Sequence, residues 1–254
     1  MVTQRTAVNP SRVIAGPPDW WPVGARKKPS WAEGDDSASQ DWVGRDPQLN
    51  PLMWLAYQAR KPLDTADIEA DFRKWFSLLG TGDTGKRIID QFMTGGGVGL
   101  LHPSGSDLSL GLVGVSKVKN FIARVKTDID TQLRYQRRQV GAADAKALAI
   151  TCDLELSTKW GLAHLNDYSL RMIAMVGGIQ GVELYVRKLR DTGPAEQVNG
   201  YSLDVRLRIR DDFGVGADDL YHGSLVSMWM LQHQRTARPF VQTIDIQFEV
   251  ANKW

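Results

Sequence analysis

The sequence is poor in cysteine, in long apolar runs and in excess charge of either sign. Its single cysteine, Cys152, can form no disulfide within one chain and cannot build a cysteine-based zinc site. No apolar run approaches the roughly 20 residues that a transmembrane helix needs. Residues 1–21 lack the apolar segment of a conventional secretory signal, so we expect none. The net charge of +2 gives no overall attraction to nucleic acid, which we therefore do not expect as a partner.

Residues 1–50 differ from the rest of the chain in composition. They hold most of the prolines and four of the nine tryptophans, but few aliphatic residues. Proline at this density opposes helices and central strands. Isolated tryptophans in such a segment indicate an extended arm that packs on a folded body, and docking on a partner is the alternative. We therefore divide the chain into an extended Pro/Trp-rich arm, 1–50, and one domain, 51–254.

The first part of that domain, residues 51–150, has the apolar spacing of amphipathic helices. Asp64 or Thr65 can cap a first helix, Thr84 a second, and Ser116 a third, longer one. The second part, residues 151–254, changes to a two-residue period. Apolar and polar residues alternate over 181–190, 201–210 and 243–250, which is typical of an antiparallel sheet with one solvated face. Helices followed by strands predict an α+β fold, with N-terminal helices packed on a C-terminal antiparallel sheet.

Three arginines, Arg206, Arg208 and Arg210, share one face of the predicted strand 201–210. Such a stripe could hold a phosphate, a pyrophosphate or a nucleic acid. The alternative, which we favour, is pairing with Asp245 and Glu249 on the polar face of the strand 243–250.

Residues 201–240 concentrate the residues that can do chemistry. If Asp218 opens a helix, His222 lies four residues later on the same face, and an Asp–His pair suits general acid–base catalysis or a divalent metal. The alternative is helix capping and turn formation by the same aspartates. His233 follows an apolar helix face and can be structural, as we also interpret His102 and His164. The candidate catalytic residues are Asp211, Asp212, Asp218, Asp219, His222 and His233, and the candidate substrate-binding residues are Arg210, Gln232 and Arg235.

The order of motifs in this block resembles a family of uncharacterised C-terminal domains of proteobacteria, whose core reads DHFGLD..D and is followed by W.LQH and PF. Asp212 stands where that family has its histidine, and Gly216 where an aspartate is usual. The residues that carry the resemblance are Arg210 to Val215, Asp218-Asp219, Trp229 to His233 and Arg238 to Phe240.

Such domains are similar to those of polymorphic toxins and type VI secretion effectors. The resemblance implies an antibacterial protein that is made in the cytoplasm, secreted without a signal peptide and active in the periplasm or envelope of the target cell. It implies a cognate immunity protein and a secretion spike or chaperone as partners. We expect a hydrolase acting on peptidoglycan or its lipid-linked precursor. One aspartate would be the base or a divalent-metal ligand, His222 or His233 the acid–base group, and Arg210 or Arg235 the phosphate holder. The alternatives are a non-enzymatic toxin that disrupts membranes or binds a partner, and a metal-dependent nuclease.

Overall fold

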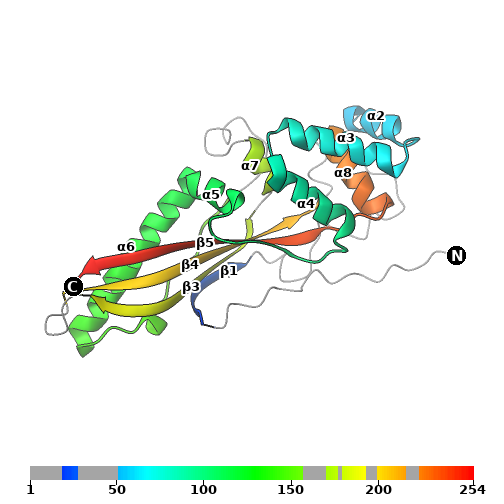
Figure 1. Ribbon diagram of the computed structural model, residues 1–254. Helices are drawn as coiled ribbons and strands as arrows, with labels where there is room; N and C mark the ends of the chain where they lie inside the picture. Colours follow the sequence, from blue (N-terminus) through cyan, green and yellow to red (C-terminus); the bar gives the residue numbers. More distant parts are fainter. Residues whose placement is uncertain (1–18, 28–50, 157–169, 177–178, 193–198, 216–222) are drawn as a thin grey trace.

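Long strands run along the molecule, with the longest helix at one end and a group of shorter helices at the other (Figure 1). The computed structural model describes residues 19–27, 51–156, 170–176, 179–192, 199–215 and 223–254. The fold is α+β, as the sequence predicts, because helices precede the main strands and pack on the sheet that those strands form.

The sheet has five strands in the order β1-β3-β4-β5-β2. Neighbouring strands are antiparallel except β2, which runs parallel to β5. All three predicted strands are confirmed and each extends beyond its predicted ends. The strands are β1 (Trp21–Lys27), β2 (Leu100–His102), β3 (Ile179–Thr192), β4 (Gly200–Phe213) and β5 (Phe240–Lys253).

The three predicted helices are also present, but their first residues differ in two cases. Asp64 caps the first of them, since its side chain accepts a hydrogen bond from the backbone N–H of Asp67 at 2.8 Å. The second begins before Thr84, and the third has Val115 rather than Ser116 at its N-cap. The helices are α2 (Pro51–Arg60), α3 (Thr65–Leu78), α4 (Gly82–Thr94), α5 (Asp107–Gly114), α6 (Ser116–Val140), α7 (Leu170–Met175) and α8 (Gly223–Gln234), with a 3₁₀ turn at Ala145–Ala147.

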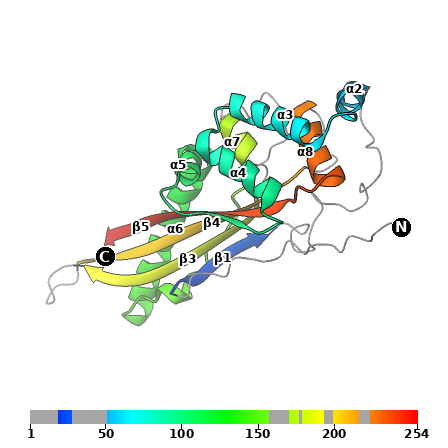
Figure 2. The same ribbon diagram turned by 45° about the vertical axis from the view of Figure 1, so that its right-hand side comes forward.

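The helices cover the apolar face of the sheet. Phe213, at the end of β4, packs edge-on against Phe76 of α3 and Phe92 of α4. At the other end of β4, the Tyr201 hydroxyl donates to Asp130 of α6 at 2.6 Å. Figure 2 shows the same division from a second direction, with α2, α3 and α8 gathered at one end of the sheet. Among the described helices, none combines the length and the apolarity needed to cross a membrane.

Part of the predicted arm belongs to the sheet, because β1 pairs with β3 along its edge. Trp20, just before β1, is buried, and the guanidinium groups of Arg187 and Arg206 lie 4.5 and 4.3 Å from its ring centroid. At Gly24 the strand passes so close to Ile150 that an added Cβ would lie 2.2 Å from the Ile150 carbonyl oxygen. The described piece of the arm, residues 19–27, therefore packs on the body, and residues 1–18 and 28–50 lie outside the described residues.

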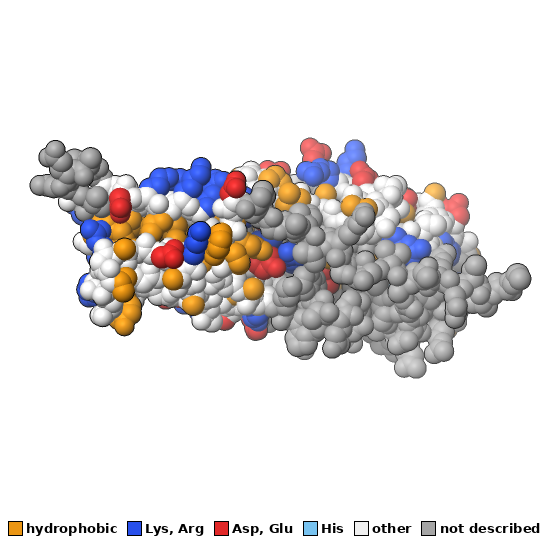
Figure 3. Space-filling view, turned by 90° about the horizontal axis from the view of Figure 1, so that it is seen from below, with side chains coloured by type: hydrophobic (Ala, Val, Ile, Leu, Met, Phe, Trp, Pro, Cys, Tyr) orange, Lys and Arg blue, Asp and Glu red, His pale blue; other side chains and the backbone are white. Residues whose placement is uncertain are grey.

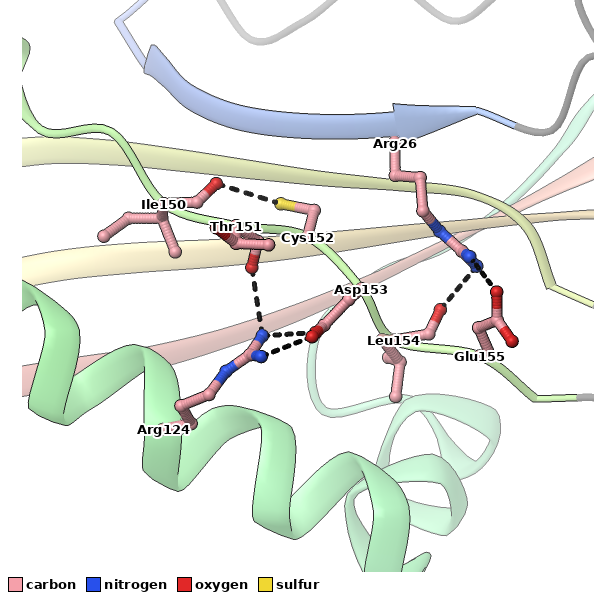
Figure 4. Close-up of polar contacts among 8 residues, drawn as sticks. All are labelled: Arg26, Arg124, Ile150, Thr151, Cys152, Asp153, Leu154 and Glu155. Atoms are coloured by element: carbon pink, nitrogen blue, oxygen red, sulfur yellow. Dashed lines mark hydrogen bonds and ion pairs between the residues drawn. The ribbon is translucent and has the colours of Figure 1, made fainter.

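The segment 150–155 lies between β1 and α6 and contacts both (Figure 4). Arg26 of β1 binds Glu155 and donates to the carbonyl oxygen of Leu154 at 2.7 Å. From the other side, Arg124 of α6 forms a two-bond ion pair with Asp153. These contacts link β1 to α6 through the segment 150–155, although β1 and α6 are far apart in the sequence.

Candidate functional site

The alternation of side chains along β4 divides three neighbouring candidate residues between the two faces of the sheet. Arg210 and Asp212 belong to the polar face, whereas Asp211 shares the apolar face with Ile209 and Phe213. Asp211 is fully buried, and Arg210 is only 2% exposed. The block that is continuous in the sequence is therefore not one continuous site.

On the polar face, the arginine stripe is engaged in ion pairs within the protein. Arg208 donates to both carboxylate oxygens of Asp245, at 2.8 and 3.0 Å, and Arg206 lies 3.5 Å from the same carboxylate. Arg210 binds Glu183 of β3 at 3.0 Å. Pairing with Asp245 is thus as the sequence predicts, while Arg210 has a partner on the other neighbouring strand. These contacts argue against a phosphate-binding role for the stripe.

This part of the polar face is buried, although the alternation predicts a solvated one. Glu183, Arg208 and Asp245 are each less than 10% exposed. Burial, and next the charge of Glu183, raises the pKa of Tyr185 to about 12, so its phenol stays protonated and donates to Glu183 at 2.9 Å. Seen from below, Lys/Arg and Asp/Glu side chains are interspersed with apolar ones over the described surface (Figure 3).

On the apolar face, Asp211 takes part in a buried polar chain that the sequence does not reveal. The Gln242 side-chain amide donates to Asp211 Oδ2 at 3.3 Å and to the Met175 carbonyl oxygen at 2.7 Å. Its oxygen Oε1 lies 3.1 Å from Nε2 of His102. Burial, the main cause, lowers the pKa of His102 to about 4. The sequence does not reveal this link. Asp211 is connected to His102 only through Gln242, and the three residues lie on three different strands.

Gln232 and His233 hold the backbone at the end of β4. Gln232 Oε1 accepts from the Val215 N–H at 2.9 Å, and its Nε2 donates to the Val215 carbonyl at 3.2 Å. Nε2 of His233 lies 3.0 Å from Gln232 Nε2, and the ring stacks on Trp229 at 4.8 Å. Burial lowers the pKa of His233. Nε2 of His233 also lies 3.5 Å from the Val215 carbonyl oxygen, so both residues contact Val215, which directly precedes the segment 216–222.

The beginning of α8 is tied to two other helices. The Ser227 hydroxyl donates to Asp71 Oδ2 at 2.6 Å, and Arg60 donates to the same oxygen from Nε at 3.0 Å. Burial works to raise the pKa of Asp71, but the hydrogen bonds from Ser227 and Arg60 prevail and lower it. At the other end of α8, Arg235 donates to the carbonyl oxygens of Gln234 and Leu63, at 3.1 and 3.4 Å. These contacts cannot be read from the sequence, since Arg60 and Asp71 lie in helices far upstream.

Asp218, Asp219 and His222 lie outside the described residues. Within the described ranges, no three His, Cys, Asp or Glu side chains come close enough together to hold a metal ion. The prediction of a divalent metal therefore depends on these three residues and stays a prediction.

Eight of the nine candidate residues thus fall into five separate groups: the arginine stripe, a buried polar chain, a clamp on Val215, Arg235 beside Leu63, and the segment 216–222. The ninth, Asp212, lies on the polar face at the end of β4. The assignment of these residues to a toxin family stays an expectation from the sequence. In comparisons of this chain with known proteins, no family model, no curated protein and no solved structure matches it.

Proposed function

We propose that this chain is an antibacterial toxin or effector that a type VI-like secretion system delivers and that acts on the bacterial cell envelope. Its reaction would be hydrolysis of peptidoglycan or of the lipid-linked precursor. The observation that carries the proposal is the anchoring of both flanks of the acidic segment 216–222, whose sequence resembles the toxin-like domains.

Binding and catalytic residues are commonly found on loops that a rigid scaffold positions. On one flank, the backbone of Val215 is held at both its N–H and its carbonyl by Gln232. On the other flank, Ser227 in α8 is bonded to Asp71 of α3. Asp218, Asp219 and His222 therefore lie between two fixed points of the chain, which supports a role in chemistry for this segment.

The contacts favour particular roles among the candidates. His233 is buried and stacked on Trp229, which favours His222 as the acid–base group. Asp218 or Asp219 would then serve as the base or as a divalent-metal ligand. Arg210 is buried against Glu183, whereas Arg235 is half-buried beside Leu63, which favours Arg235 for contact with a phosphate of the substrate.

The test is directed expression in a sensitive bacterium. A version exported to the periplasm should stop growth, and the same chain kept in the cytoplasm should not. The cognate immunity protein, sought in an adjacent short reading frame, should restore growth when both are exported. Equal killing from the cytoplasm would overturn the envelope assignment and favour the nuclease alternative.

Single variants place the activity within the chain. His222→Ala and one of Asp218→Ala and Asp219→Ala should each abolish killing while keeping the wild-type melting temperature, because residues used for chemistry can be truncated at little cost in stability. The double variant should be no weaker than either single one, since residues that act as a unit are not additive. Killing that survives all three single substitutions would place the activity elsewhere.

A second candidate function, a toxin that disrupts membranes without catalysis, is favoured by one feature of α2. Leu52 and Leu55 on its outer side are 72% and 64% exposed, and Trp54 is 37% exposed. Several exposed apolar side chains on one short helix are typical of surfaces that bind partner proteins or lipid. Leakage of dye from anionic liposomes that is lost in Leu55→Asp but kept in His222→Ala would favour this function over the hydrolase.

A further inference from the structure

A buried hydrogen-bonded chain joins the short edge strand β2 to the rest of the sheet. His102 is the last residue of β2 and is 1% exposed. Its ring meets Gln242 of β5, which in turn meets Asp211 of β4 and the last turn of α7 at Met175. Four elements thus converge on one side-chain amide.

The orientation of that amide fixes the protonation of the imidazole. Gln242 Nε2 faces two acceptors, the Met175 carbonyl and the Asp211 carboxylate, so its oxygen must face His102. The oxygen can only accept, and His102 Nε2 therefore carries the proton that it donates at 3.1 Å. Nδ1 is then the unprotonated nitrogen. It is buried and has no hydrogen-bond partner in the part of the chain that the structure describes.

A second proton on this ring would be costly where it lies. It would create a buried N–H at Nδ1 without an acceptor, in addition to a buried charge. Among the described groups, Arg87 on α4 opposes the added charge. Asp211 on β4 contacts the ring only indirectly, because the Gln242 amide lies between its carboxyl group and the ring. Burial is the main cause that lowers the pKa of His102 from 6.5 to about 4; the hydrogen bond to Gln242 works to raise it, and Arg87 adds a smaller lowering effect.

Among the described residues, the backbone pairing that holds β2 in the sheet is short. The strand pairs with β5 over three residues, Leu100 to His102, and lies at the sheet edge. Just beyond it, Ser104 Oγ accepts a hydrogen bond from the Gln247 N–H at 2.9 Å. Because β2 connects α4 to α5, its release would change how both helices are attached to the sheet.

We propose that His102 makes the junction of β2 and β5 an acid-sensitive latch, which holds with a neutral ring and opens when the ring becomes protonated. This inference is independent of the proposed reaction, because it concerns neither the segment 216–222 nor any substrate. It would give the protein two conformations that the acidity of its surroundings selects.

The sign and the size of the effect follow from proton linkage. The folded state disfavours the charged ring, so the stabilising contribution is complete above pH 6.5 and is lost as the pH falls toward about 4. If the ring regains its ordinary pKa in the open state, moving from pH 7.5 to pH 4.5 favours opening about 70-fold.

The test is amide hydrogen exchange of the full chain at pH 7.5 and pH 4.5, corrected for the intrinsic exchange rate at each pH. Protection of the amides of residues 100–102 should fall about 70-fold in the wild type. His102→Gln keeps an N–H donor for Gln242 but cannot be protonated, so its protection should change by less than about threefold. His233→Gln, a substitution of a buried histidine far from β2 in the sequence, should respond as the wild type does. A wild type that keeps its protection, or a His102→Gln variant that loses it equally, would overturn the proposal.

If the His102→Gln variant does not fold, NMR of the wild-type protein alone still tests the proposal. Nitrogen-15 NMR of the assigned His102 ring should show the Nε2–H tautomer at pH 7.5, with no titration near pH 6.5. A ring that is protonated at Nδ1, or that titrates near 6.5 in the folded protein, would refute the latch.

Discussion

Replacing Asp245 by alanine should destabilise the protein more than removing any exposed acidic partner. The carboxylate of Asp245 accepts two hydrogen bonds from Arg208, at 2.8 and 3.0 Å, and the two side chains are 7% and 3% exposed. Its loss leaves the Arg208 guanidinium charged and buried, and Arg206 loses the same partner. Breaking a buried ion pair from one side costs about 3–5 kcal/mol.

Urea unfolding measures this cost. With an m-value of about 3 kcal/mol/M, the midpoint should fall by about 1–1.7 M. The matched control is Asp153→Ala, which also removes a two-bond partner of an arginine, but one whose side chain is 57% exposed. Exposed ion pairs contribute at most about 1 kcal/mol, so the control midpoint should move by about 0.3 M or less. Equal shifts for the two variants would show that the polar face of β4 is solvated and that the reasoning is wrong.

Two other substitutions test the local structure. Gly24→Ala should lower the free energy of unfolding by about 1–3 kcal/mol and expose β1 amides to hydrogen exchange, because the new Cβ would lie 2.2 Å from a backbone oxygen that cannot move aside. Gly114→Ala, where nothing lies within 4 Å, is its control and should be neutral or stabilising, and a similar loss in both would refute the close approach. Asp64→Ala should cost about 1 kcal/mol in thermal unfolding by removing the cap of α3, and an unchanged melting temperature would contradict that role.

The elements that the sequence predicts correctly are those whose signal is local. Period-two alternation marks β3, β4 and β5, and the carboxylate of Asp64 lies next to the helix that it caps. The predicted N-cap of α6 is wrong by one position, since Ser116 is a good capping residue but lies inside the first turn. The strand β1 is not predicted, because it lies in a proline-rich segment and its partner β3 is distant in the sequence.

The site was harder to predict for a physical reason. The alternation of apolar and polar residues predicts that Arg208 and Asp245 share a face of the sheet. It does not predict whether that face is exposed to solvent. It also gives no hint that His102 and Gln242 meet, since a parallel edge strand brings them together. The sequence predicts Gln232 as a substrate-binding and His233 as a catalytic residue, whereas in the structure both contact the backbone of Val215.

The edge position of β1 has a consequence for how the chain folds during synthesis. β1 pairs with β3, whose residues 181–186 follow it by about 160 positions in the chain. At a synthesis rate of about 5–20 residues per second, β1 waits roughly 10 to 30 s for its partner. The hairpins of β3, β4 and β5 close over much shorter loops, so they can form before the N-terminal strand docks. The strand β1 is therefore expected to join β3 only after β3 and β4 have paired, and until then the outer edge of β3 is open to pairing with another chain.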